Sequence, residues 1–106
     1  MGMDLLSMLG FKKRDAITLA IDEALALLEE KNYDAAIAVI NDKALSRNPE
    51  HTRALLHLGI CHMLKGEFDH AESILQPLAR QPRMDSESAA ASIALEKIAA
   101  DRAKLA

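Results

Sequence analysis

The chain has 106 residues, of which half are hydrophobic but only three are aromatic, and its formal net charge is −3. An acidic chain with so few aromatic side chains lacks the basic surface and the stacking platforms that nucleic-acid binding requires, so we exclude nucleic acid as a partner. The apolar residues are mainly alanine and leucine, which favour helices, so the composition predicts a single all-α domain.

Sequence signals for localisation favour the cytoplasm. Cys61 is the only cysteine and cannot form an internal disulfide, as is typical of a reducing compartment. No apolar run approaches the roughly 18–20 residues of a membrane span. The first apolar stretch precedes its basic residues, which is the reverse of a signal peptide. We therefore expect a cytoplasmic protein.

The first two predicted helices form a pair. Asp15 caps the first helix, which should end near residues 31–32, because Asn32 tolerates a left-handed turn. Its apolar residues follow helical spacing: Ile17, Ile21, Ala24, Leu25 and Leu28. The second helix spans about residues 34–46, and its expected core residues are Ala36, Ile37, Ile40 and Leu45.

Three further helices follow. We expect Asn48 to cap a helix over about residues 50–65, with Pro49 in its first turn. The apolar residues of this third helix lie on nearly all of its sides, so other elements should cover it on more than one side. Gly66 should end the third helix, and a fourth helix should begin near Phe68. Pro77 should kink or shorten this fourth helix, and Pro82 should end it. A last helix over about residues 86–105 should have a polar far side and bury Ala89, Ile93, Ala94, Ile98 and Leu105.

Two segments, residues 31–36 and 66–71, lie 35 positions apart and share a turn, an aromatic residue, an aspartate and an alanine. A period near 34 residues with helix–turn–helix units is typical of tetratricopeptide repeats. The second unit resembles this family through Leu55-x₂-Leu58-Gly59-x₂-His62, Ala71-x₃-Leu75 and Pro82. The first unit resembles it through Ala20-x₂-Glu23-Ala24-x₂-Leu27, Ala36-x₃-Ile40 and Pro49. The closing prolines arrive one residue late and one residue early, and neither unit has the family's tryptophan or tyrosine in its first helix.

This resemblance implies a right-handed stack of antiparallel helical hairpins over residues 15–106, preceded by a short amphipathic segment, residues 1–14. The first repeat covers about residues 17–49, the second about 50–83, and a capping helix about 86–105. A cap of this kind solvates the end of a stack of repeats.

The resemblance also implies a concave groove lined by the first helix of each unit. The matching positions in the first unit are Thr18, Ile21, Leu25, Leu28 and Glu29. Those in the second unit are Arg53, Leu56, Ile60, Met63 and Leu64. Aliphatic residues occupy the inner positions where carboxylate-clamping members of the family carry Lys, Arg and Asn. An aliphatic groove suits a hydrophobic peptide or an amphipathic helix, although the same residues would also serve as core.

The N-terminal segment offers a second candidate docking surface. It combines an apolar stretch with a basic cluster: Leu5, Leu6, Met8, Leu9, Phe11, Lys12, Lys13 and Arg14. Three basic residues give only weak attachment to an anionic membrane, at about 1 kcal/mol each. Self-packing into the groove or pairing with a second copy of the chain ranks above lipid contact.

The sequence predicts no catalytic residue, no cofactor and no metal site. His57 and Cys61 lie one helical turn apart and His62 is adjacent, but a tetrahedral metal site needs more ligands, and His51 and His70 lie at helix starts. No third group is in view to orient a Cys61–His57 nucleophile pair. The expected function is therefore protein–protein interaction, as an adaptor, co-chaperone-like subunit or assembly factor. The alternative is a membrane-peripheral or self-associating scaffold that docks through residues 1–14.

Overall fold

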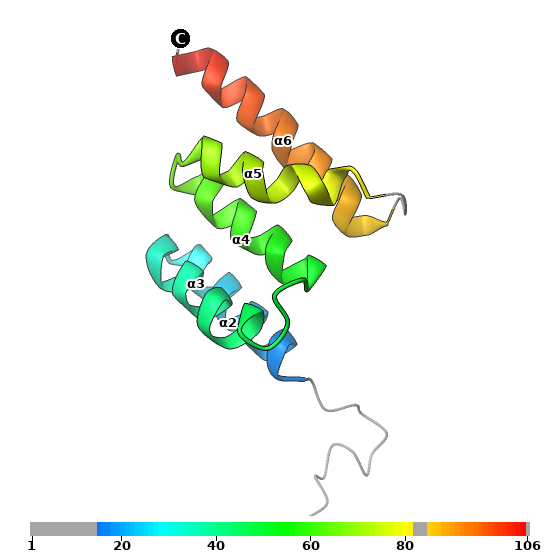
Figure 1. Ribbon diagram of the computed structural model, residues 1–106. Coiled ribbons are helices and arrows are strands. Elements are labelled where there is room, and N and C mark those ends of the chain that lie inside the picture. The colour runs from blue at the N-terminus through cyan, green and yellow to red at the C-terminus, as the bar shows by residue number, and fades with distance from the viewer. Residues whose placement is uncertain (1–14, 82–84, 106) are drawn as a thin grey trace, which may run out of the picture.

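The computed structural model describes residues 15–81 and 85–105. The elements are α2 (Ala16–Glu29), α3 (Tyr33–Val39), η1 (Ile40–Leu45), α4 (Thr52–Leu64), α5 (Phe68–Ala79) and α6 (Ser86–Leu105). These described ranges contain no β-strand. Figure 1 shows the helices stacked in chain order, from α2 at one end to α6 at the other. The predicted all-α stack of helical hairpins is confirmed.

The first hairpin pairs α2 with α3 and η1. Asp15 caps α2 as expected, because its Oδ1 accepts a hydrogen bond of 2.7 Å from the backbone N–H of Thr18. The left-handed residue after α2 is Lys31, with φ of 61°, and not Asn32. The second helix begins at Tyr33 and continues beyond Val39 as η1, a π-helix that extends to Leu45.

The second hairpin pairs α4 with α5, and the start of α4 differs from the prediction. The capping residue is His51, whose Nδ1 accepts a hydrogen bond of 3.2 Å from the backbone N–H of Ala54. Asn48 instead closes a turn, because its Oδ1 accepts from the backbone N–H of Glu50. Pro49 lies in that turn and therefore precedes the helix.

The other end of α4 follows the prediction. Gly66 has φ of +84°, and the N–H groups of Gly66 and Glu67 donate to the carbonyls of Met63 and His62. This paired hydrogen bonding is a Schellman motif, which ends a helix at a left-handed residue. Pro77 lies in the last turn of α5, which ends at Ala79.

Two core clusters meet at α4. Ala54, Leu58 and Cys61 pack with the first hairpin, whereas Leu56 and Met63 pack with α5 and α6. This arrangement explains why α4 carries apolar residues on nearly all of its sides, and it confirms that other elements cover the helix on more than one side.

The buried face of α6 agrees with the prediction at Ala94 and Ile98 but differs at the other predicted positions. Ser88, Ala91, Ala94 and Ile98 face α5 and α4, whereas Ala89, Ile93 and Leu105 are exposed. Ile93 keeps 66% of its surface exposed, so the far side of this helix is less polar than expected. The helix carries alanine on several sides, and the spacing of its apolar residues therefore fits more than one face.

Candidate partner-binding surface

The predicted groove residues lie on α2 and α4, but they differ in burial. Ile21, Leu56 and Met63 are buried, and their side chains have little surface left for a partner. Glu29 and Leu64 are exposed, and the rest are half-buried: Thr18, Leu25, Leu28, Arg53 and Ile60. The burial of Leu56 and Met63 follows from α6, which packs against α4 as well as α5.

The structure forms two adjoining hollows where the C-terminal half of α6 passes the turn between α4 and α5. The smaller hollow has a volume of about 350 Å³ and is lined by Met63, Leu64, Gly66, Phe68, Lys97, Asp101, Lys104 and Leu105. The larger has a volume of about 390 Å³ and is lined by Gly66, Phe68, Asp69, Arg102 and Leu105. We call the two together the α4–α6 hollow. It includes two of the predicted groove residues, Met63 and Leu64.

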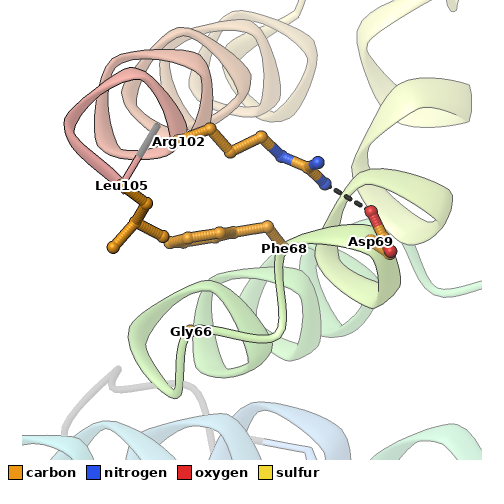
Figure 2. A pocket seen from close by; sticks show the side chains of 5 residues that line it. All are labelled: Gly66, Phe68, Asp69, Arg102 and Leu105. Atoms are coloured by element: carbon orange, nitrogen blue, oxygen red, sulfur yellow. Dashed lines mark hydrogen bonds and ion pairs between the residues drawn. The ribbon is translucent and has the colours of Figure 1, made fainter.

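The Schellman turn at Gly66 reverses the chain and delivers Phe68 to the first position of α5. Figure 2 shows the Phe68 side chain extending toward Leu105, with Arg102 above it. The Arg102 guanidinium carbon lies 5.8 Å from the centroid of the Phe68 ring. At this distance the cation is attracted by the face of the ring. Phe68 therefore forms an apolar floor between the hairpin and α6.

Ion pairs line the edge of this hollow, and Arg102 links α6 to α5. Arg102 contacts Asp69 at 2.5 Å and also pairs with Glu72 on the next turn of α5. The hydrogen bond to Asp69 raises the pKa of Arg102, so the guanidinium stays charged. Lys97 pairs with Asp101 at 3.4 Å along the other rim. The hollow thus combines apolar walls with a charged rim, which is suited to recognition of an amphipathic segment.

Two hydrophobic side chains of this hollow are exposed to an unusual degree. Leu64 keeps 42% of its surface exposed and Leu105 keeps 77%. Both lie beside Phe68 in the smaller hollow. A partner that covers them gains hydrophobic burial at about 25 cal/mol per Å² of apolar surface.

Residues with reactive side chains on α4 are not arranged for nucleophilic chemistry. Cys61 is fully buried, and burial raises the pKa of its thiol to about 11, so the thiol is protonated at neutral pH. His57 has a buried Nδ1 with no hydrogen-bond partner among the described residues.

The sequence did not identify Phe68, Lys97, Asp101, Lys104 and Leu105 as site residues. Phe68 was predicted to begin the fourth helix and was otherwise noted as the aromatic residue of a turn, and Leu105 was expected to be buried. The available signal was the position of Phe68 directly after Gly66, which places an aromatic side chain at the tip of a hairpin.

The second candidate surface, residues 1–14, lies outside the described residues. The docking residues Leu5, Leu6, Met8, Leu9, Phe11, Lys12, Lys13 and Arg14 therefore stay a sequence prediction. Among the described residues, no helix is both long and apolar enough to span a membrane.

Comparison with known proteins identifies the fold family. The sequence model of the tetratricopeptide repeat family matches residues 21–95, which cover both hairpins and the first half of α6. No curated protein and no solved structure matches the chain. The chain therefore belongs to the tetratricopeptide repeat family, whose repeats generally mediate protein–protein interaction.

Proposed function

We propose that the chain binds a hydrophobic or amphipathic helix of a partner protein in the α4–α6 hollow. The observation that supports this proposal is the exposure of Leu64 and Leu105 beside Phe68, on a hollow shared by three helices. Helix recognition of this kind uses apolar side chains at spacings of three and four residues. The hollow offers apolar contacts from α4, α5 and α6 to such a stripe.

Charge at the rim defines the partner further. The smaller hollow is lined by two cationic side chains, Lys97 and Lys104, and by one carboxylate, Asp101. A partner helix with acidic residues beside its apolar stripe would complement this excess of positive charge, mainly by raising the association rate and selecting the orientation.

This binding would suit an adaptor, a co-chaperone-like subunit or an assembly factor, and the cytoplasm would suit the single buried cysteine. The predicted groove residues on α2, including Thr18, Leu25 and Glu29, would extend the contact along the stack if the partner is longer than the hollow.

The test is affinity capture from source-cell lysate with three forms of the full chain. The first is unaltered, the second carries Leu64→Glu and Leu105→Glu, and the third carries Ile93→Glu as a matched control. All three substituted side chains are exposed, so circular dichroism should show that each variant folds. The control places one such charge on an exposed apolar residue of α6 that does not line the hollow, whereas the double variant places two charges inside it.

We expect a protein that the unaltered chain and the Ile93→Glu form retain but the double variant loses. Loss of two central apolar contacts should weaken binding by about tenfold or more. Retention of the same proteins by all three forms would count against the hollow as the binding surface.

A further inference from the structure

Three potential metal ligands meet at the tip of the second hairpin. His62 lies in the last turn of α4, Glu67 immediately precedes α5, and His70 lies in the first turn of α5. The turn at Gly66 reverses the chain and so brings the two histidines together, although eight positions separate them in the sequence.

The distances between these side chains are short. Nδ1 of His62 lies 2.7 Å from Oε1 of Glu67, and the imidazole rings of His62 and His70 stack with centroids 4.0 Å apart. One ligand atom from each of the three residues lies within 4.8 Å of the other two. Ligand atoms of a tetrahedral zinc ion are separated by about 3.3 Å, given bond lengths near 2.0–2.1 Å. Coordination of one ion requires the exposed side chains of Glu67 and His70 to rotate, because the nitrogen lone pairs of stacked imidazole rings lie in the ring planes and do not converge.

We propose that His62, Glu67 and His70 form a binding site for Zn²⁺. Two imidazole nitrogens and one carboxylate oxygen are a ligand set that zinc uses, with water at the fourth position. Imidazole nitrogens also discriminate against Mg²⁺ and Ca²⁺, which prefer oxygen ligands.

The surroundings of the site favour binding of a cation at the hairpin tip. His62 is buried, so its ring is fixed by packing, whereas Glu67 and His70 are exposed and accessible to an incoming ion. Lys65 is the competing cation: its Nζ lies 3.6 Å from the other Glu67 oxygen, Oε2, but is held at 2.5 Å by Asp34.

A metal at this position would join the last turn of α4 to the first turn of α5. The ion would stabilise the hairpin tip, because binding to the folded chain alone raises its stability in proportion to the logarithm of the ion concentration.

The test is isothermal titration of Zn²⁺ alone into the untagged, chelator-treated full chain at neutral pH. Co²⁺ absorption in the visible range gives a second readout of four-coordinate geometry. The variants are His70→Ala and Glu67→Gln, which alter exposed side chains. The control is His51→Asn, which removes an imidazole outside the site and keeps a side chain able to cap α4.

We expect one Zn²⁺ per chain, and binding at least about tenfold weaker in both His70→Ala and Glu67→Gln, since loss of even an outer-shell partner costs that much. The His51→Asn form should bind as the unaltered chain does. Absence of saturable binding, or binding that either ligand substitution leaves unchanged, overturns the proposal.

Discussion

Gly59 of α4 packs directly against α5. A Cβ atom at this position would lie 2.6 Å from both Cγ and Cδ2 of Leu75, and 3.4 Å from Cγ2 of Ile74. Leu75 is fully buried, so it has little freedom to move away. Close packing against Leu75 therefore explains why the repeat pattern has a small residue at position 59.

Gly59→Ala should destabilise the chain, even though alanine is the better helix former. Overpacking a core costs about 1–3 kcal/mol, whereas the gain in helix propensity is about 1 kcal/mol. We expect a net loss of about 1 kcal/mol or more in the free energy of unfolding, measured by urea titration. The same substitution in a Leu75→Ala background should be neutral or stabilising, because the clash is gone. An equal loss in both backgrounds would show that contact with Leu75 is not the cause.

His57 should make the chain sensitive to mild acid. Burial lowers the pKa of His57 below its ordinary value of 6.5, and Arg53 lowers it further, while Glu87 acts in the opposite direction. Below pH 6.5 the unfolded chain therefore binds a proton that folded His57 resists, so stability falls as the pH drops from 6.5 through the folded pKa.

Replacing His57 with leucine removes this titration. Urea midpoints measured at pH 7 and pH 5 should differ less for His57→Leu than for the unaltered chain, since the other titrating groups are common to both. An unchanged difference between the two pH values would mean that His57 is as easily protonated in the folded chain as in the unfolded one.

At the scale of elements, the ends of α2 and α4 use the same turn with different residues. The N–H groups of Lys31 and Asn32 donate to the carbonyls of Leu28 and Leu27, which repeats the pattern seen at Gly66. Lys31 adopts φ of 61°, a conformation that is unfavourable for a residue with a Cβ. The offset of 35 residues between the two units pairs Lys31 with Gly66, and both residues have a positive φ, so the two units use the same type of turn.

Lys31→Gly should stabilise the chain. Relief of a left-handed lysine contributes about 1–2 kcal/mol, and the greater freedom of unfolded glycine offsets about 0.5–1 kcal/mol. We expect the thermal midpoint to rise. Glu30→Gly is the matched control and should lower it, because Glu30 has a negative φ of −85°. A lower midpoint for Lys31→Gly would contradict the strain at this turn.

The π-helix η1 accounts for a feature of the repeat spacing. The two turns lie 35 residues apart, one more than the usual 34, and Pro49 arrives one residue late. A π-helix carries an extra residue in its turn, so Ile40–Leu45 can hold the added position without moving the elements on either side. The late proline was visible in the sequence, but the place of the extra residue was not, because any position between the turns could have held it.

The limits of sequence reasoning are clearest in α6. Its bounds were predicted correctly, since residues 86–105 contain good helix formers after a proline. Its buried face was predicted only in part, because alanines lie on several sides of the helix and burial depends on how α5 packs against it. Ala94 and Ile98 are buried as predicted, whereas Ala89, Ile93 and Leu105 are exposed. The exposure of Leu105, and with it the α4–α6 hollow, could be seen only once the helices were packed. The start of α4 was misplaced for a local reason, since Asn48 and His51 can both cap and only the turn geometry selects between them.

At the scale of the whole molecule, α4, α5 and α6 form one end of the stack of hairpins (Figure 1), and residues of these three helices and of the turn at Gly66 line the α4–α6 hollow. Family membership accounts for protein–protein interaction in general, whereas the proposed binding surface rests on the lining of the α4–α6 hollow and its charged rim. The predicted groove on α2 and α4 remains a prediction. Because Ile21, Leu56 and Met63 are buried, substitutions that test this groove belong at its exposed residues.

The most direct test of partner binding in the hollow is site-specific photo-crosslinking in source cells. A photoreactive phenylalanine analogue is placed at position 64 or 105 inside the hollow, and at position 93 on the outer side of α6. We predict a crosslinked partner protein from positions 64 and 105 but not from position 93. A partner crosslinked from position 93 alone would place binding on the outer face of α6 and contradict this account.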